Sequence, residues 1–336
     1  MYRLLISTVL LLSVVTCTPI DTPPHNGEGL AGPNIKTLDR KSFQANFVLN
    51  LPFDGTIHES NGWYLLSGYN ENQDRHALIS LSRTEELPTL HTFCLSADST
   101  GKVWAIRFTG TPENPLCELT PKGWVTHTML AKEGLLGIVK VTESRLWLST
   151  RRGIIVWNTQ TKQIEQRADL PSFSRYFPSL RAVSLVDGAL VVYKNVINSA
   201  DVDRFALDNL VSSSKRRKAR IWAAYEDPHG IIWIVAGDAN WDGVLLRYDG
   251  QRLKRVSIVP YHYLDSGRSV SGLILDKSGN LWINVDSYTY IYLKEGKWAV
   301  PQIRPTGPDE YRSYYIVRGL NNSVLFNDEG KLHQVQ

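Results

Sequence analysis

The chain has 336 residues, of which 43% are apolar and 21% charged, which excludes a wholly disordered or low-complexity protein. Ten Trp and 15 Tyr against two Met favour a β-structure over a helical bundle, because aromatic side chains suit pleated, half-buried surfaces. A formal charge of only +4 gives no reason to expect a nucleic-acid partner.

Residues 1–16 have the features of a signal peptide. Arg3 supplies a positive charge, and residues 4–15 are mainly apolar; at about 1.5 Å per residue they are too short to span a bilayer core of about 30 Å. The segment ends in Val14-Val15-Thr16-Cys17, which resembles the lipobox of bacterial lipoproteins, whose cysteine is diacylated and becomes the mature N-terminus. Thr16 departs from that pattern, in which Gly, Ala or Ser precedes the cysteine.

The resemblance implies an exported lipoprotein anchored in a membrane through Cys17, and ordinary secretory cleavage is the alternative. Position 18 is Thr and not Asp, which implies sorting to the outer membrane if the host is Gram-negative. Residues 17–42 are polar and rich in Pro and Gly, which is typical of a flexible tether. We therefore expect a lipidated cysteine and a disordered linker before the folded domain.

The rest of the chain consists of repeated units. Each unit has an acidic or Gly turn, a short apolar run that often contains Trp, and a second apolar run. Equivalent anchor positions occur at residues 63, 104, 147, 191, 233, 282 and 325, which are 41 to 49 residues apart. This period is typical of a four-stranded propeller blade. The sequence therefore predicts an all-β fold: a seven-bladed β-propeller formed by a single domain, residues 43–336.

The fifth unit shows the expected strands most clearly, at residues 220–226, 231–236, 244–248 and 252–258. The last unit lacks a fourth strand, whereas residues 45–51 form a strand-like run before the first unit. We expect this N-terminal run to join the last blade as its outer strand, because that pairing closes the ring and removes its open edges.

The clearest units resemble the two-component-regulator propeller repeat, Asp-x-x-Gly-x-aliphatic-Trp-aliphatic, with one extra spacer residue. The pattern is carried by Asp98, Gly101 and Trp104, by Asp227, Gly230 and Trp233, and by Asp276, Gly279 and Trp282. In that family the repeats form sensor ectodomains of bacterial hybrid regulators, often linked to glycan sensing, and they also occur in streptogramin lyase. A fold-level resemblance says little about activity.

Standard catalytic motifs are absent from the sequence, and no cofactor is expected. Cys94 and Cys117 should lie in the first and third strands of blade two, roughly 9–10 Å apart, so we predict two buried free thiols. The eight His residues lack the spacing of metal ligands, and no metal site is expected. Asp238, Asn240 and Asp242 resemble the start of a calcium loop, but the acid at its twelfth position is missing.

Basic side chains recur just before the expected inner strands, six to eight residues ahead of each acidic or Gly turn. They are His91, Arg181, Arg220, Arg268 and Arg312. If they converge on one mouth of the central channel, they would suit an anionic ligand, since guanidinium groups bind carboxylate and phosphate in a forked geometry. The alternative is that they cap strand ends or pair with the Asp residues of the repeat.

Two further features concern surfaces. Trp241 lies outside the core position of the repeat, in the loop 237–243, and is a candidate stacking platform for a sugar, with plain packing between blades as the alternative. The basic run at residues 212–220 falls where we expect the outer strand of blade four. We interpret this basic run as a solvent-exposed edge of the blade, or alternatively as a contact to anionic lipid or polysaccharide.

These features together predict an extracytoplasmic, lipid-anchored, monomeric propeller that binds a ligand without catalysis. An anionic or glycan ligand at the channel mouth is the concrete version. A protein-docking scaffold in envelope assembly is the first alternative, and a metal-dependent lyase resembling streptogramin lyase is the second.

Overall fold

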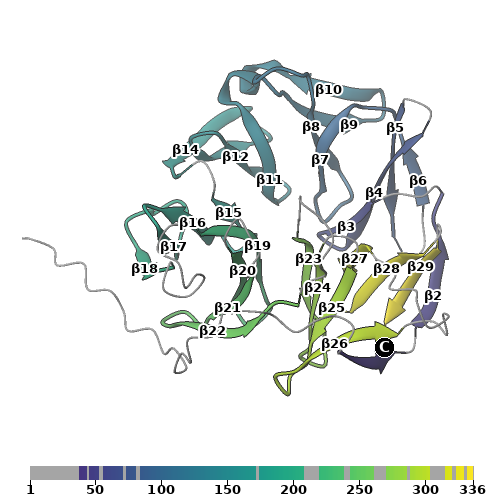
Figure 1. Cartoon of the computed structure of the whole chain (residues 1–336). Coiled ribbons are helices and arrows are strands. Elements are labelled where there is room, and N and C mark those ends of the chain that lie inside the picture. Colours follow the sequence, from purple (N-terminus) through teal and green to yellow (C-terminus); the bar gives the residue numbers. More distant parts are fainter. Residues whose placement is uncertain are drawn as a thin grey trace, which may run out of the picture.

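The fold is given by a computed structural model that describes residues 38–43, 45–52, 56–70, 73–80, 84–171, 174–207, 219–237, 243–260, 270–285, 288–302, 315–319, 323–328 and 331–335. Within them the chain forms seven sheets arranged in a ring (Figure 1). This confirms the predicted seven-bladed propeller.

In each blade the strands follow one another in sequence from the centre of the ring outwards (Figure 1). Blade one contains β3 (Thr56–Ser60), β4 (Trp63–Asn70), β5 (Gln73–Ile79) and β6 (Thr84–Leu87). Blade two contains β7 (Thr92–Ala97), β8 (Val103–Arg107), β9 (Leu116–Thr120) and β10 (Gly123–His127), followed by the 3-10 helix η2 (Thr128–Glu133). Blade three contains β11 (Leu135–Val141), β12 (Arg145–Thr150), β13 (Gly153–Asn158) and β14 (Gln163–Asp169).

The remaining blades follow the same antiparallel meander. Blade four contains β15 (Arg175–Tyr176), β16 (Ala182–Val186), β17 (Ala189–Tyr193) and β18 (Val202–Ala206). Blade five contains β19 (Arg220–Glu226), β20 (Ile232–Gly237), β21 (Val244–Tyr248) and β22 (Leu253–Ile258). Blade six contains β23 (Val270–Leu275), β24 (Leu281–Val285), β25 (Tyr288–Tyr292) and β26 (Trp298–Gln302), and blade seven contains β27 (Tyr315–Arg318), β28 (Val324–Asp328) and β29 (Lys331–Val335).

The N-terminal part of the chain closes the ring. Strand β2 (Ala45–Asn50) pairs antiparallel with β29 and becomes the outer strand of blade seven, as the sequence predicted. Residues 39–42, which the sequence analysis assigned to the tether, instead form β1 (Asp39–Ser42), which pairs in parallel with β26. The entering chain therefore joins two neighbouring blades, because β1 adds to blade six and β2 to blade seven.

The turns between first and second strands explain the repeat pattern. In blade six, Asp276 Oδ1 accepts hydrogen bonds from the backbone N–H groups of Ser278 and Asn280 at 2.8 and 2.9 Å. Its Oδ2 accepts one from Trp282 Nε1 at 2.9 Å, and Asp227 accepts the same bond from Trp233 Nε1 at 3.1 Å. One carboxylate thus holds the turn and orients the indole six residues later.

Blade four departs from the expected register. In the unit anchored at residue 191, the acidic-Gly turn is Asp187-Gly188, which by the repeat pattern would join the first and second strands; it joins β16 to β17, the second and third. The true inner strand, β15, is only two residues long and has no recognisable alternation of apolar residues. The outer strand of the described sheet is β18; of the basic run at 212–220, residues 212–218 lie outside the described residues and Arg220 begins β19.

Candidate functional site

The propeller has two distinct faces, which follow from the meander of each blade. We call "loop face" the side where inner strands begin and where second strands connect to third strands. We call "turn face" the side that carries the turns between first and second strands, such as the turn at Asp98 between β7 and β8. Ligand sites are usually concave, so any hollow on either face is a candidate site.

A cleft of about 740 Å³ lies on the loop face between blades two and three. Its walls are the β8–β9 loop, helix η2, the β12–β13 turn and the end of β14. Its charged lining residues are Glu113, Lys132, Glu133, Arg151, Arg152, Arg167 and Asp169. The lining of this ligand-sized cleft thus includes four basic and three acidic residues.

Arg151 and Arg152 form the two-residue turn between β12 and β13, and both are exposed. Thr150 Oγ1 accepts hydrogen bonds from the backbone N–H groups of Arg152 and Gly153 at 3.1 and 3.2 Å. Arg152 O accepts a third from Leu170 N at 2.8 Å, which ties the turn to the chain after β14. The backbone that carries the two guanidinium groups is therefore held on both sides.

Gly153 is required by the geometry of this turn. Its φ is +148°, and a Cβ there would lie 2.1 Å from the carbonyl oxygen of Ala168. Gly134, at the end of η2, has a φ of +63°, and the aliphatic part of Arg151 packs 3.4 Å from the position its Cβ would take. Both positions favour glycine, and together they let the Arg151 side chain lie close to the backbone of the neighbouring segment.

Arg167 differs from the other cations of the cleft because it is fully paired. Its two terminal nitrogens donate to the two carboxylate oxygens of Glu133 at 2.6 and 2.7 Å. These hydrogen bonds hold the pKa of Glu133 below its ordinary value. Within the described part of the chain, Lys132, Arg151 and Arg152 form no ion pair, although the charge of Arg152 also helps to lower the pKa of Glu133.

Sequence reasoning missed this cleft. The signal was the run Thr150-Arg151-Arg152-Gly153, a two-residue hairpin turn with a basic pair at its tip between two apolar strands. The predicted basic residues precede the inner strands, whereas Arg151 and Arg152 lie between the second and third strands of blade three.

Two of the sequence-predicted residues, His91 and Arg220, occupy equivalent positions on the loop face. Each stands two residues before a β-bulge residue, Phe93 and Trp222 respectively. His91 is paired, because its Nδ1 lies 2.5 Å from Asp74 Oδ2 of blade one. Arg220 is exposed and forms no ion pair with the described residues.

Arg181 lies on the opposite face. It precedes β16, and its Nη1 donates to Glu226 Oε1 at 2.8 Å and to Gly230 O at 2.7 Å, both at the turn between β19 and β20. Its guanidinium carbon lies 5.5 Å from the ring centroid of Tyr248. Arg181 therefore ties blade four to blade five on the turn face and does not join His91 and Arg220.

The other sequence-predicted residues lie outside the described residues. They are Cys17, Trp241, Arg268 and Arg312, together with the calcium-like Asp238, Asn240 and Asp242.

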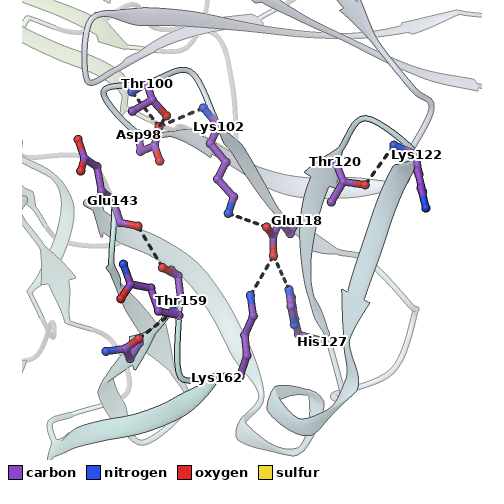
Figure 2. Close-up of polar contacts among 12 residues, drawn as sticks. Asp98, Thr100, Lys102, Glu118, Thr120, Lys122, His127, Glu143, Thr159 and Lys162 are labelled. Carbon is purple, nitrogen blue, oxygen red and sulfur yellow. Dashed lines mark hydrogen bonds and ion pairs between the residues drawn. The ribbon is translucent and has the colours of Figure 1, made fainter.

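An ionic cluster lies on the turn face of the same two blades. Glu118 of β9 accepts hydrogen bonds from Lys102 of blade two and Lys162 of blade three, at 2.6 and 3.1 Å, and from His127 Nε2 at 3.0 Å (Figure 2). The Glu118 and His127 side chains are only 12% and 11% exposed. Blades two and three are thus joined by one ionic cluster.

Two tryptophans lie beneath this cluster. The rings of Trp104 and Trp157 meet edge to face with centroids 5.7 Å apart, and the ammonium groups of Lys102 and Lys162 lie over them at 4.8 and 5.1 Å. The indole nitrogens of both tryptophans are buried without a hydrogen-bond partner. In blade two the repeat Trp therefore contacts cations and does not bond to the repeat Asp.

The two cysteines match their predicted positions. Cys94 in β7 and Cys117 in β9 are free thiols separated by β8, where Cys94 lies opposite Ile106 and Cys117 opposite Ala105; Cys117 is buried and Cys94 half-buried. Burial raises the pKa of both thiols. Among the described residues, no group of three His, Cys, Asp or Glu side chains is placed to hold a metal ion. The same part of the chain contains no helix with the length and hydrophobicity needed to cross a bilayer.

No protein-family model and no curated protein matches the sequence. Solved structures match the fold. The extracellular domain of a hybrid two-component system from B. thetaiotaomicron aligns with a TM-score of 0.53 at 12% identity, over 87% of this chain and 39% of that one. Against that larger protein, this chain spans well under half of the length.

Two further structures align over nearly their whole length. A streptogramin B lyase structure has a TM-score of 0.54 at 15% identity, covering 88% of this chain and 97% of that one. YCF48 bound to D1 peptide has a TM-score of 0.55 at 10% identity, covering 89% and 97%. At these identities the likeness shows a shared β-propeller fold, and two-component-system ectodomains are among its members, as the repeats predicted.

Proposed function

We propose that this protein is an exported, non-catalytic binding module that takes an anionic ligand in the loop-face cleft between blades two and three. The observation that carries the proposal is the pair Arg151 and Arg152, held on a tied two-residue turn with no ion-pair partner among the described residues. The proposed ligand site is thus the cleft between blades two and three, and not the ring of basic residues at the channel mouth that the sequence suggested.

The chemistry of the cleft favours carboxylate or phosphate groups. Arginine binds such groups through two parallel hydrogen bonds, and its planar head loses little freedom when it does so. A turn that is already fixed in the free protein adds to the affinity, because less has to be ordered on binding. Glu113 and Asp169 in the same lining disfavour a ligand that carries several closely spaced negative charges.

Binding of anions tests the proposal directly. Oligogalacturonate, citrate and inorganic phosphate serve as probes in isothermal titration calorimetry, with neutral maltohexaose for comparison. We expect at least one anion to bind, and the double variant Arg151→Ala with Arg152→Ala to raise its Kd at least tenfold. The matched control is Lys122→Ala with Arg145→Ala, which removes the same charge from the turn face. Equal losses in both variants would show a general charge effect and overturn the site.

Export and anchoring are part of the proposal. They are supported by the signal-like residues 1–16 and by the extracellular domains among the structures that share the fold. We propose lipidation at Cys17 and, in a Gram-negative host, an outer-membrane location. Growth with radiolabelled palmitate should label the native chain and not Cys17→Ser, and only the native chain should sediment with membranes. A labelled Cys17→Ser chain would contradict lipidation at this residue.

The lyase alternative gains no support from a specific observation. Such an activity needs a constellation of metal-binding side chains, and the described residues hold none on either face. The scaffold alternative is different, because exposed apolar side chains occur on or beside the segments that line the cleft.

A further inference from the structure

We propose that the ligand of the cleft is an acidic segment of a partner protein, whose carboxylates meet Arg151 and Arg152 while its apolar side chains pack on Phe108, Met129 and Leu136. This inference rests on the proposed function, because it names the class of anion that the cleft receives.

The first support is the distribution of exposed apolar side chains. Among the described residues, five large hydrophobic side chains are exposed, and four of them lie between residues 108 and 136. Phe108, 46% exposed, and Met129, 60% exposed, belong to segments that line the cleft, and Leu136, 44% exposed, lies two residues after Gly134 of the lining. Exposed apolar side chains on neighbouring segments are a feature of protein-binding surfaces.

Two of these side chains are carried by segments that line the cleft, although neither is itself a lining residue, and the Phe108 ring meets the His91 ring edge to face at 5.1 Å. Phe108 follows β8 and begins the loop whose Pro112 and Glu113 form one wall. Met129 belongs to helix η2, which contributes Lys132 and Glu133 to the lining. Phe108 and Met129 are therefore each carried by a segment that also carries a charged residue of the cleft.

Leu136 is placed by a β-bulge. In the pairing of β11 with β12, Leu135 lies opposite Thr150 and Gly137 opposite Ser149, so Leu136 has no partner in the ladder. Bulges redirect a side chain from its regular alternation and are enriched beside binding sites. Here the bulge stands beside Thr150, the residue that holds the Arg151-Arg152 turn.

The combination of groups distinguishes a polypeptide from a sugar. Sugars bind flat aromatic rings and hydrogen-bonding groups, whereas Met and Leu offer them little. Interfaces between proteins are enriched in Met, aromatic residues and Arg, and the flexible thioether of Met adapts to different partners. An acidic segment with apolar side chains satisfies the arginines and covers the three exposed hydrophobic groups at the same time.

The test uses synthetic twelve-residue peptides of four compositions: acidic with Leu and Phe, acidic with Ser and Gln, basic with Leu and Phe, and neutral with Leu and Phe. Fluorescence anisotropy with the full mature chain gives each Kd, and oligogalacturonate is titrated in parallel. We expect the acidic apolar peptides to bind at least tenfold more tightly than the other three classes.

Variants test the apolar side chains and the arginines of the surface separately. Met129→Ser with Leu136→Ser should weaken the acidic apolar peptides at least fivefold and leave oligogalacturonate binding unchanged. Arg151→Ala with Arg152→Ala should weaken both kinds of ligand. Phe47→Ser, which removes an apolar side chain 54% exposed on blade seven, is the matched control and should have no effect.

The outcomes separate this inference from the proposed function. Binding of oligogalacturonate that depends on the arginines, without binding of acidic apolar peptides, overturns the peptide inference and leaves the anion site standing. Equal affinity for acidic peptides with and without apolar residues overturns the docking role of Met129 and Leu136. If no anion and no peptide binds, both proposals fail.

Discussion

Lys162 of blade three donates a hydrogen bond across the blade boundary to Glu118 of blade two at 3.1 Å. This bond lies on the turn face, between the same two blades whose loop-face sides form the cleft. The two blades that form the candidate site are thus fixed to each other by a charged pair whose acid is nearly buried.

We expect Glu118→Gln to destabilise the protein by about 1–3 kcal/mol, because Lys102, Lys162 and His127 would lose the charged acceptor they share. Urea denaturation measures the free energy of unfolding. Glu86→Gln is the control, since Glu86 pairs with Arg75 at an exposed position, where an ion pair is worth about 1 kcal/mol at most. Equal effects of the two substitutions would contradict a special role for Glu118.

The same cluster should make stability depend on pH. Burial lowers the pKa of His127, and Lys162 and Lys102 lower it further against the opposing effect of Glu118. The folded state therefore binds the proton of His127 less readily than the unfolded chain, whose His titrates near 6.5. Stability is complete above that pH and falls as the pH drops through it towards the folded pKa.

Denaturation at pH 7.5, 6.5 and 5.5 checks this dependence with His127→Gln beside the native chain. We expect a smaller loss of stability in the variant over this range. Some loss should persist, because burial also lowers the pKa of His76. An identical pH profile in both proteins would show that His127 does not contribute.

The pKa of Glu118 governs a second, more acidic range. Burial raises this pKa, but hydrogen bonds from Lys102, Lys162 and His127 outweigh burial and hold it below the ordinary value. The stabilisation by ionised Glu118 is therefore present above about pH 4.3 and is lost as the pH falls further. Glu118→Gln should flatten the profile below pH 4.5, and an unchanged acid limb would contradict the assignment.

Substitution of Gly153 should disturb the cleft through sterics. We expect Gly153→Ala to cost about 2 kcal/mol more than Gly250→Ala, because both positions have positive φ but only the first would press a Cβ against a backbone oxygen. Thermal and urea denaturation give the difference. Similar costs at the two glycines would show that the chain near Ala168 yields easily.

Removal of the N-terminal strands should reveal how the ring is closed. A chain starting at residue 45 loses β1 and keeps β2, so we expect it to fold with reduced stability. A chain starting at residue 53 also loses the pairing of β2 with β29 and uncovers the side of Leu332, which is fully buried. We expect it to aggregate, as judged by size-exclusion chromatography; a stable monomer would contradict closure by β2.

Thiol reactivity checks the interior of blade two. In a Cys17→Ser background, Cys94 and Cys117 should react with Ellman's reagent at least a hundredfold more slowly in the native protein than in urea, because burial keeps both thiols protonated and inaccessible. Two equivalents of thiol should be titrated after unfolding. A single equivalent, or none, would indicate a disulfide and a different strand register.

The sequence by itself determined the repeating architecture. The spacing from Asp to Trp marks a turn held by one carboxylate, an interaction within a few residues that does not depend on the rest of the ring. Local alternation likewise placed the strands of blade five within one residue of their observed bounds, and it identified the run that becomes β2. Each of these features is set by interactions along one strand or one hairpin.

Only the tertiary structure decided which side chains meet. Arg181 and Arg220 look alike in sequence, yet the two-residue β15 shifts the count of strands in blade four and sends Arg181 to the other face. The cleft joins residues from two blades, and the apolar groups beside it depend on a bulge and a 3-10 helix. Such contacts depend on how the blades pack against one another, which local patterns of apolar and polar residues do not specify.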